Sequence, residues 1–151
     1  MKIEILREHL DSAINAVARV SNKNTSLPVL GCVLITAGKD RAILQATNLD
    51  FSVEVALRAK ILEVGVVAVP TTTLTQTISA TSDSKITLEV VGSVLTMRSE
   101  SGTASITTMS HEDFPTIPYV GVGQEATIPT HTLIAALRAV SYGCLFLWKA
   151  F

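Results

Sequence analysis

The sequence predicts an α+β fold of two β-α-β-β-β modules, with two helices packed on one side of antiparallel sheet. Three observations predict it. Apolar residues recur at helical spacing in two segments, and each segment is followed by short strands with alternating polarity. The strands are separated by brief polar turns rich in Gly, Ser and Asp. The third observation is that a strand and helix pattern at the start of the chain returns near its end.

The first module begins with an alternating strand at residues 2–6 and a helix at residues 7–20. The helix has one apolar stripe, formed by Leu10, Ala13, Ile14, Val17 and Val20. Proline at position 28 biases the residue before it towards extended geometry, so a strand is expected to start near Val29. A hairpin turn is expected at residues 38–40. The alternation over residues 51–59 places Phe51 on the buried face of a further strand.

The second module begins with a strand at residues 66–69, and Pro70 then suits the first position of a helix. The helix at residues 71–80 is rich in threonine, a weak helix former. The spacing of four between Leu74 and Ile78 nevertheless favours it. Strands at residues 85–91, 94–99 and 103–109 complete the module.

Five apolar positions of the first strand and helix recur at a constant offset of 123 residues. They are Ile5, Leu10, Ala13, Ile14 and Val17, which match Ile128, Leu133, Ala136, Leu137 and Val140. A spacing of this size indicates tandem domains, because solenoid repeats have periods of about 20 to 50 residues. We therefore expect one domain at residues 1–123, and the strand and helix that open a second at residues 124–151. Chance similarity between two amphipathic helices is the alternative.

Composition narrows the class of protein. Apolar residues make up 48% of the chain, which is enough to form a core, and charged residues make up only 17%. The 12 basic and 13 acidic side chains nearly cancel, so tight autonomous DNA binding is not indicated. Two distant cysteines, Cys32 and Cys144, with no signal peptide and no long apolar run, predict a reduced, soluble, cytoplasmic protein.

No catalytic residue is predicted. Ser110, His111, Glu112 and Asp113 offer a nucleophile, a base and acids, but adjacent loop residues do not form a triad, whose members meet through the fold. The three histidines and two cysteines lack zinc-site spacing, and no phosphate-binding glycine motif is present. We expect no metal and no cofactor, and a binding or structural protein instead of an enzyme.

Five strings, in order along residues 1 to about 142, carry a family resemblance. They are Met1-Lys2-Ile3 continuing to Arg7-Glu8-His9-Leu10, Leu27-Pro28-Val29-Leu30, Ala46-Thr47-Asn48-Leu49-Asp50, Val69-Pro70, and Glu112-Asp113-Phe114-Pro115. The chain resembles the first domain of the bacterial DNA polymerase III beta subunit, the sliding clamp. That resemblance implies a DNA clamp fold and a non-catalytic processivity factor in DNA replication. In the family, three such domains form a subunit, and two subunits close head to tail into a homodimer ring around duplex DNA.

The resemblance also implies residues that contact partners. For double-stranded DNA, contacted weakly through its phosphates, they are Lys23 and Asn24 in the loop after the first helix, with Arg7 and Arg19 as lesser candidates. Solvated surface charge is the alternative for these residues. For the neighbouring clamp subunit, the matching positions are Thr73, Thr77, Ala104 and Ile106. The second helix carries Thr72 and Ser79 where basic residues often stand in the family, which weakens its electrostatic attraction for DNA.

Polymerase and clamp loader bind the full-length family between its second and third domains, so we expect no such peptide pocket here. The apolar segment 143–151 departs from the family and suggests a truncated or frameshifted product, or a hydrophobic anchor onto the protein's own sheet or a partner. A self-associating β-rich module, or a fragment without a DNA role, is the alternative function.

Overall fold

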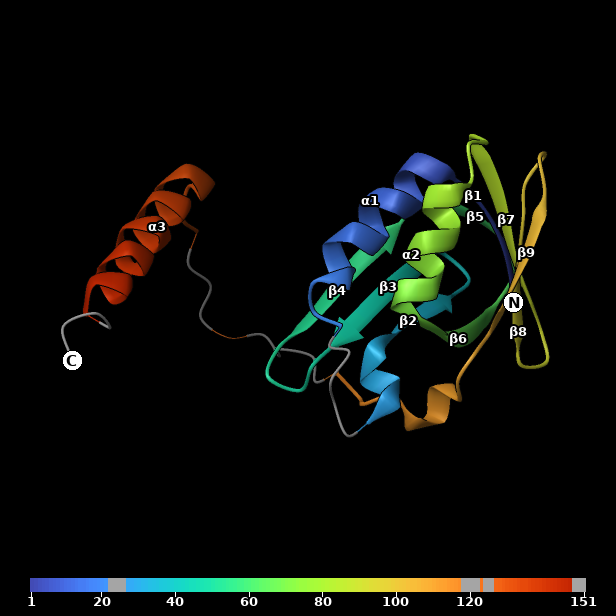
Figure 1. Ribbon diagram of the computed structural model, residues 1–151, viewed down its shortest axis with the longest axis horizontal. Coiled ribbons are helices and arrows are strands. Elements are labelled where there is room, and N and C mark those ends of the chain that lie inside the picture. The colour runs from blue at the N-terminus through green and yellow to red at the C-terminus, as the bar shows by residue number, and fades with distance from the viewer. Residues whose placement is uncertain (22–26, 118–122, 124–126, 148–151) are drawn as a thin grey trace. The chain divides into compact units, whose positions relative to one another are not determined.

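Two antiparallel sheets form the framework of the protein (Figure 1). The computed structural model describes residues 1–21, 27–117, 123 and 127–147. It separates the chain into two units, Met1–Ile117 and Pro118–Phe151. In the first unit, one sheet has the strand order β5-β1-β7-β8-β9 and the other has the order β4-β3-β2-β6. The described part of the second unit contains helix α3, Thr130–Leu147.

The strands of the first unit are short. Their bounds are β1 Lys2–Leu6, β2 Cys32–Ala37, β3 Ala42–Thr47, β4 Ser52–Leu57, β5 Ala59–Glu63, β6 Gly65–Pro70, β7 Lys85–Val91, β8 Val94–Arg98 and β9 Thr103–Thr107. The helices are α1 Arg7–Ala18 and α2 Thr71–Ala80, with 3₁₀ turns η1 Pro28–Gly31 and η2 His111–Asp113. Both predicted β-α-β-β-β modules and both predicted helices are therefore confirmed.

Helix α1 packs by the stripe that the sequence predicts. The five stripe residues, from Leu10 to Val20, are each no more than 5% exposed. They contact the inner faces of β3 and β4 and the neighbouring helix α2. Burying a large aliphatic side chain contributes roughly 1.5–3 kcal/mol, so this stripe is a principal source of the domain's stability.

Helix α2 forms from a sequence of low helix propensity because its apolar residues pack into the core. The Oγ1 atoms of Thr75, Thr77 and Thr81 donate to the backbone carbonyls of Thr71, Thr73 and Thr77, at 2.8, 2.7 and 3.0 Å. Bonding to the carbonyl four residues earlier is how threonine is accommodated inside a helix. The fully buried Leu74 and Ile78 then fix this helix to the core.

The prediction that Phe51 lies on the buried face of a strand is wrong, because its side chain is 53% exposed. It lies in the turn before β4 instead of in the strand. The Asn48 side-chain oxygen accepts the backbone N–H groups of Asp50 and Phe51, and Leu49 has a φ of 77°. The hydrogen bonds of Asn48 therefore hold Phe51 in a turn, although the alternating pattern predicts a strand there.

Two strand predictions are also corrected. Pro28 opens the 3₁₀ turn η1, so β2 begins at Cys32 and not near Val29. The single alternating run at residues 51–59 divides after Leu57, and β5 joins the other sheet by pairing with β1. The strand predicted to open a second domain stays a prediction, because residues 124–126 lie outside the described residues. The end of the predicted apolar tail, residues 148–151, lies outside the described residues.

Gly65 provides a test of packing at the start of β6. A Cβ atom added there would lie 2.7 Å from the Cβ of Met1 and 3.2 Å from its Cα. We expect Gly65→Ala to lower the free energy of unfolding by about 1–3 kcal/mol in a urea titration, as overpacking does. The matched control is Gly102→Ala in the β8–β9 turn, where no heavy atom lies within 4 Å of the new methyl group. Equal stability of the two variants would contradict this account.

Asp83 provides a test that depends on pH. Its carboxylate accepts hydrogen bonds from the side chain and the backbone N–H of Ser101, which lower the pKa of Asp83. A group with a lowered pKa in the folded protein adds stability at pH values above its unfolded pKa, and this stability disappears as the pH falls through the folded value.

We therefore expect Asp83→Asn to be less stable than the original chain at pH 6, and the difference to shrink steadily as the pH is lowered towards 3. Thermal unfolding at a series of pH values measures it. Asp40→Asn, in the exposed β2–β3 turn, is the control that should show a smaller change. A difference that does not depend on pH would exclude this role for the carboxylate.

Candidate functional site

Helices α1 and α2 lie side by side and run in opposite directions (Figure 1). A contact at each end of the pair fixes this arrangement. At one end, the Nε of Arg7 lies 3.4 Å from the carbonyl oxygen of Ile78, to which it donates. At the other end, the hydroxyl groups of Ser21 and Thr71 are 2.8 Å apart. The start of each helix is thus bonded to the end of its neighbour.

The exposed residues of the pair form one surface, which we call the helical surface. It consists of Glu8, Ser12, Asn15, Ala16, Thr72, Thr73, Gln76, Ser79 and Ala80, together with Arg19 immediately after α1. Its two exposed charges, Glu8 and Arg19, have opposite signs, and hydroxyl and amide groups supply the remaining polarity. Such a surface can hydrogen-bond to an anionic ligand but attracts it only weakly over distance.

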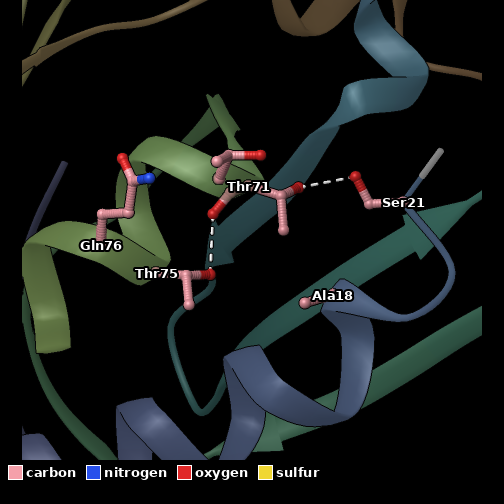
Figure 2. A pocket seen from close by; sticks show the side chains of 6 residues that line it. Ala18, Ser21, Thr71, Thr75 and Gln76 are labelled. Atoms are coloured by element: carbon pink, nitrogen blue, oxygen red, sulfur yellow. Dashed lines mark hydrogen bonds between the residues drawn. The ribbon is translucent and has the colours of Figure 1, made fainter. Parts of the chain in front are cut away.

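A shallow pocket of about 250 Å³ lies between the end of α1 and the start of α2 (Figure 2). Its lining comprises Ala18, Ser21, Thr71, Thr72, Thr75 and Gln76. Thr71 is 5% exposed, and its hydroxyl bonds to Ser21, while its backbone carbonyl accepts from Thr75. Sequence reasoning missed the Ser21–Thr71 contact, because no local pattern signals a bond between residues 50 positions apart.

The predicted DNA-contacting residues fall at different places in the structure. Arg19 is exposed at the end of α1. Arg7 is half-buried, and its guanidinium is directed to the last turn of α2, where a cation favourably meets unpaired carbonyl groups. Lys23 and Asn24 lie outside the described residues, in the segment that follows Ser21 directly.

The residues predicted at a subunit interface come from α2 and β9. Thr73 is exposed, and Thr77 and Ala104 are half-buried. Ile106 is 3% exposed within the core, so its side chain is not available to a partner, and any contact at this position would involve its backbone. Strand β9 is outermost in its sheet, and a strand at that position presents unpaired backbone groups.

The Ser110 to Asp113 string has a local structural role. Ser110 is the residue before η2, and its hydroxyl accepts the backbone N–H of Glu112 at 3.3 Å. This is helix capping, for which serine followed by acidic residues is well suited. Within the described parts of the chain, no group of three or more His, Cys, Asp or Glu side chains is placed to hold a metal ion. Likewise, none of the helices described there is long and apolar enough to cross a membrane.

Comparison with known proteins agrees with this geometry. Residues 1–118 match the family model described as the DNA polymerase III beta subunit, N-terminal domain. The beta sliding clamp of Chlamydia muridarum is 33% identical over 143 residues, which cover 94% of this chain and 39% of the relative. That of Synechocystis sp. is 30% identical over 155 residues, covering 97% of this chain and 39% of the relative.

The solved structure of the Caulobacter crescentus pol III beta protein superimposes with a TM-score of 0.82 at 25% identity. The superposition covers 89% of this chain and 36% of the Caulobacter crescentus protein. The chain thus spans well under half the length of the clamps that it matches. Because the family model accounts for residues 1–118 and the observed fold is that of a clamp domain, the chain belongs to the DNA polymerase III beta subunit family.

Proposed function

We propose that this chain supplies the first domain of a DNA sliding clamp, the processivity factor of bacterial DNA replication. The observation that carries the proposal is the helical surface, formed by two antiparallel helices in a chain of the beta subunit family. A clamp has to hold duplex DNA without stopping at any sequence. Contacts to phosphates do this, because they position a protein on DNA but carry no sequence information.

The helical surface suits weak contact of this kind. Its hydroxyl and amide groups can donate to phosphate oxygens, either directly or through water. In our proposal Lys23, Asn24 and Arg19 add the electrostatic attraction at the end of α1. Arg7 is a lesser candidate, because its guanidinium already bonds to α2. The chain acts by binding and takes no part in chemistry.

Ring closure in this proposal places further clamp subunits head to tail against the outer edge of β9 and the exposed face of α2. Thr73, Thr77 and Ala104 would contribute side-chain contacts, and the backbone of β9 would contribute hydrogen bonds. Polymerase and clamp loader would bind domains other than this one, since their peptide pocket is expected between the second and third domains of the full-length family.

Lys23→Ala tests the phosphate contact. We expect the variant to bind short duplex DNA more weakly, because one counterion-releasing contact is lost. The slope of log affinity against log salt should fall in magnitude by about 0.9. Fluorescence anisotropy at several salt concentrations measures this slope. Lys39→Ala, in the exposed β2–β3 turn, is the matched control. An equal change in both variants would show that Lys23 has no special role.

The topology of binding is tested with the 151-residue chain alone. We expect it to bind linear and closed circular duplex equally, because one clamp domain cannot encircle DNA. Affinity should fall roughly 10- to 40-fold between 50 and 200 mM salt, as for two or three phosphate contacts. Gel-shift titration measures both quantities. Salt-resistant retention on closed circles alone would refute the expectation and would reveal a ring assembled from several copies.

A further inference from the structure

The methionine side chains of the first unit differ in their access to solvent. Met109, in the short segment between β9 and η2, is 37% exposed. Met97 in β8 is 3% exposed, and the side chain of Met1 is 1% exposed. Oxidation of a thioether requires that an oxidant reach the sulfur atom. A more exposed methionine is therefore expected to be oxidised faster than a buried one. Met109 is therefore the most exposed of the three methionines.

The sulfur of Met109 also contacts a buried thiol. The Cys32 Sγ–H donates to the Met109 Sδ at a sulfur-to-sulfur distance of 3.3 Å. Cys32 is 1% exposed, and burial raises the pKa of its thiol, so it stays protonated and is a poor nucleophile. Met109 also lines a solvent-open pocket of about 290 Å³, together with Val66, Val67 and Ser110.

We propose that Met109 is a reversible oxidation site for peroxides, and that its oxidation is transmitted to Cys32. In the reaction, the Met109 thioether sulfur attacks one oxygen of hydrogen peroxide and the O–O bond breaks. A sulfoxide and one water molecule form. The sulfur is oxidised by two electrons, the peroxide is reduced by two, and the Cys32 thiol is not consumed. Methionine sulfoxide reductases reverse the change.

The location of Met109 gives the modification a structural consequence. Its backbone N–H donates to the carbonyl of Ala68 at 2.9 Å, which connects the segment before η2 to β6. A sulfoxide is larger and far more polar than a thioether, and here it would lie against the buried thiol and the valines of the pocket. The contact at 3.3 Å must widen or rotate to accommodate the new oxygen. Cys32 then loses part of its cover.

Peptide mapping of the full chain after mild hydrogen peroxide treatment tests the site. Trypsin separates the four sulfur positions that matter: residues 24–39 contain Cys32, 86–98 contain Met97, 99–138 contain Met109 and 139–149 contain Cys144. We expect one added oxygen in the 99–138 peptide at least about tenfold faster than in the 86–98 peptide, because buried Met97 reacts only from opened states. Methionine sulfoxide reductases should remove it. Equal rates for the two peptides, or sulfenic acid at Cys32 before any change at Met109, would overturn the proposal.

Transmission to Cys32 is measured separately, by the rate of iodoacetamide labelling of the 24–39 peptide. After peroxide treatment this rate should rise at least about threefold in the original chain and in Met97→Leu. It should not rise in Met109→Leu, whose labelling before peroxide shows whether the fold is intact. If Met109→Leu labels rapidly from the start, Met109→Gln, a polar analogue of the sulfoxide, replaces it and should label at the oxidised rate. A labelling rate that oxidation leaves unchanged would refute the link to Cys32.

Discussion

The antiparallel pairing of α1 and α2 is the constraint on which the rest of the first unit depends. Helix α1 covers β3 and β4, whereas α2 contacts β6 and β9, so the pair connects strands of both sheets. Leu10, Leu74 and Ile78 are fully buried in this layer. The bonds at the two ends, Arg7 to Ile78 and Ser21 to Thr71, allow little sliding of one helix along the other. The same packing that forms the core therefore sets the shape of the helical surface.

Charge is distributed unequally between the two sides of this domain. On the outward face of the five-stranded sheet, Glu4 pairs with Lys60 and Lys85, and Glu89 pairs with Lys2 and Arg98. Such exposed pairs contribute little to stability, but they neutralise basic side chains far from the helices. The helical surface retains hydroxyl groups in their place. In the role proposed for this domain, a small number of unpaired cations on the helical surface would keep its non-specific attraction to DNA phosphates weak.

Local sequence patterns determined most of the elements but few of the long-range contacts. The bounds of α2 could be predicted from Pro70 and the Leu74–Ile78 spacing, even though its threonines argue against a helix. The exposure of Phe51 could not, because it depends on a side-chain bond from Asn48 that alternation does not reveal. Local patterns also do not indicate that β4 and β5 belong to different sheets. Nor do they indicate the contact between Cys32 and Met109, which are 77 positions apart. The candidate DNA-contacting residues came from the family resemblance. The structure adds that Arg7 bonds to the carbonyl of Ile78 in α2, whereas Arg19 is exposed.

The internal repeat shows that an apolar stripe does not by itself create a core. Leu10, Ile14 and Val17 of α1 are fully buried, whereas their equivalents in α3, Leu133, Leu137 and Val140, are 44%, 61% and 66% exposed. The pattern is the same, but α1 has a sheet and a second helix against it. Most helical stability in proteins comes from packing an apolar face. The stripe of α3 therefore contributes to stability only when a surface like that of β3, β4 and α2 covers it.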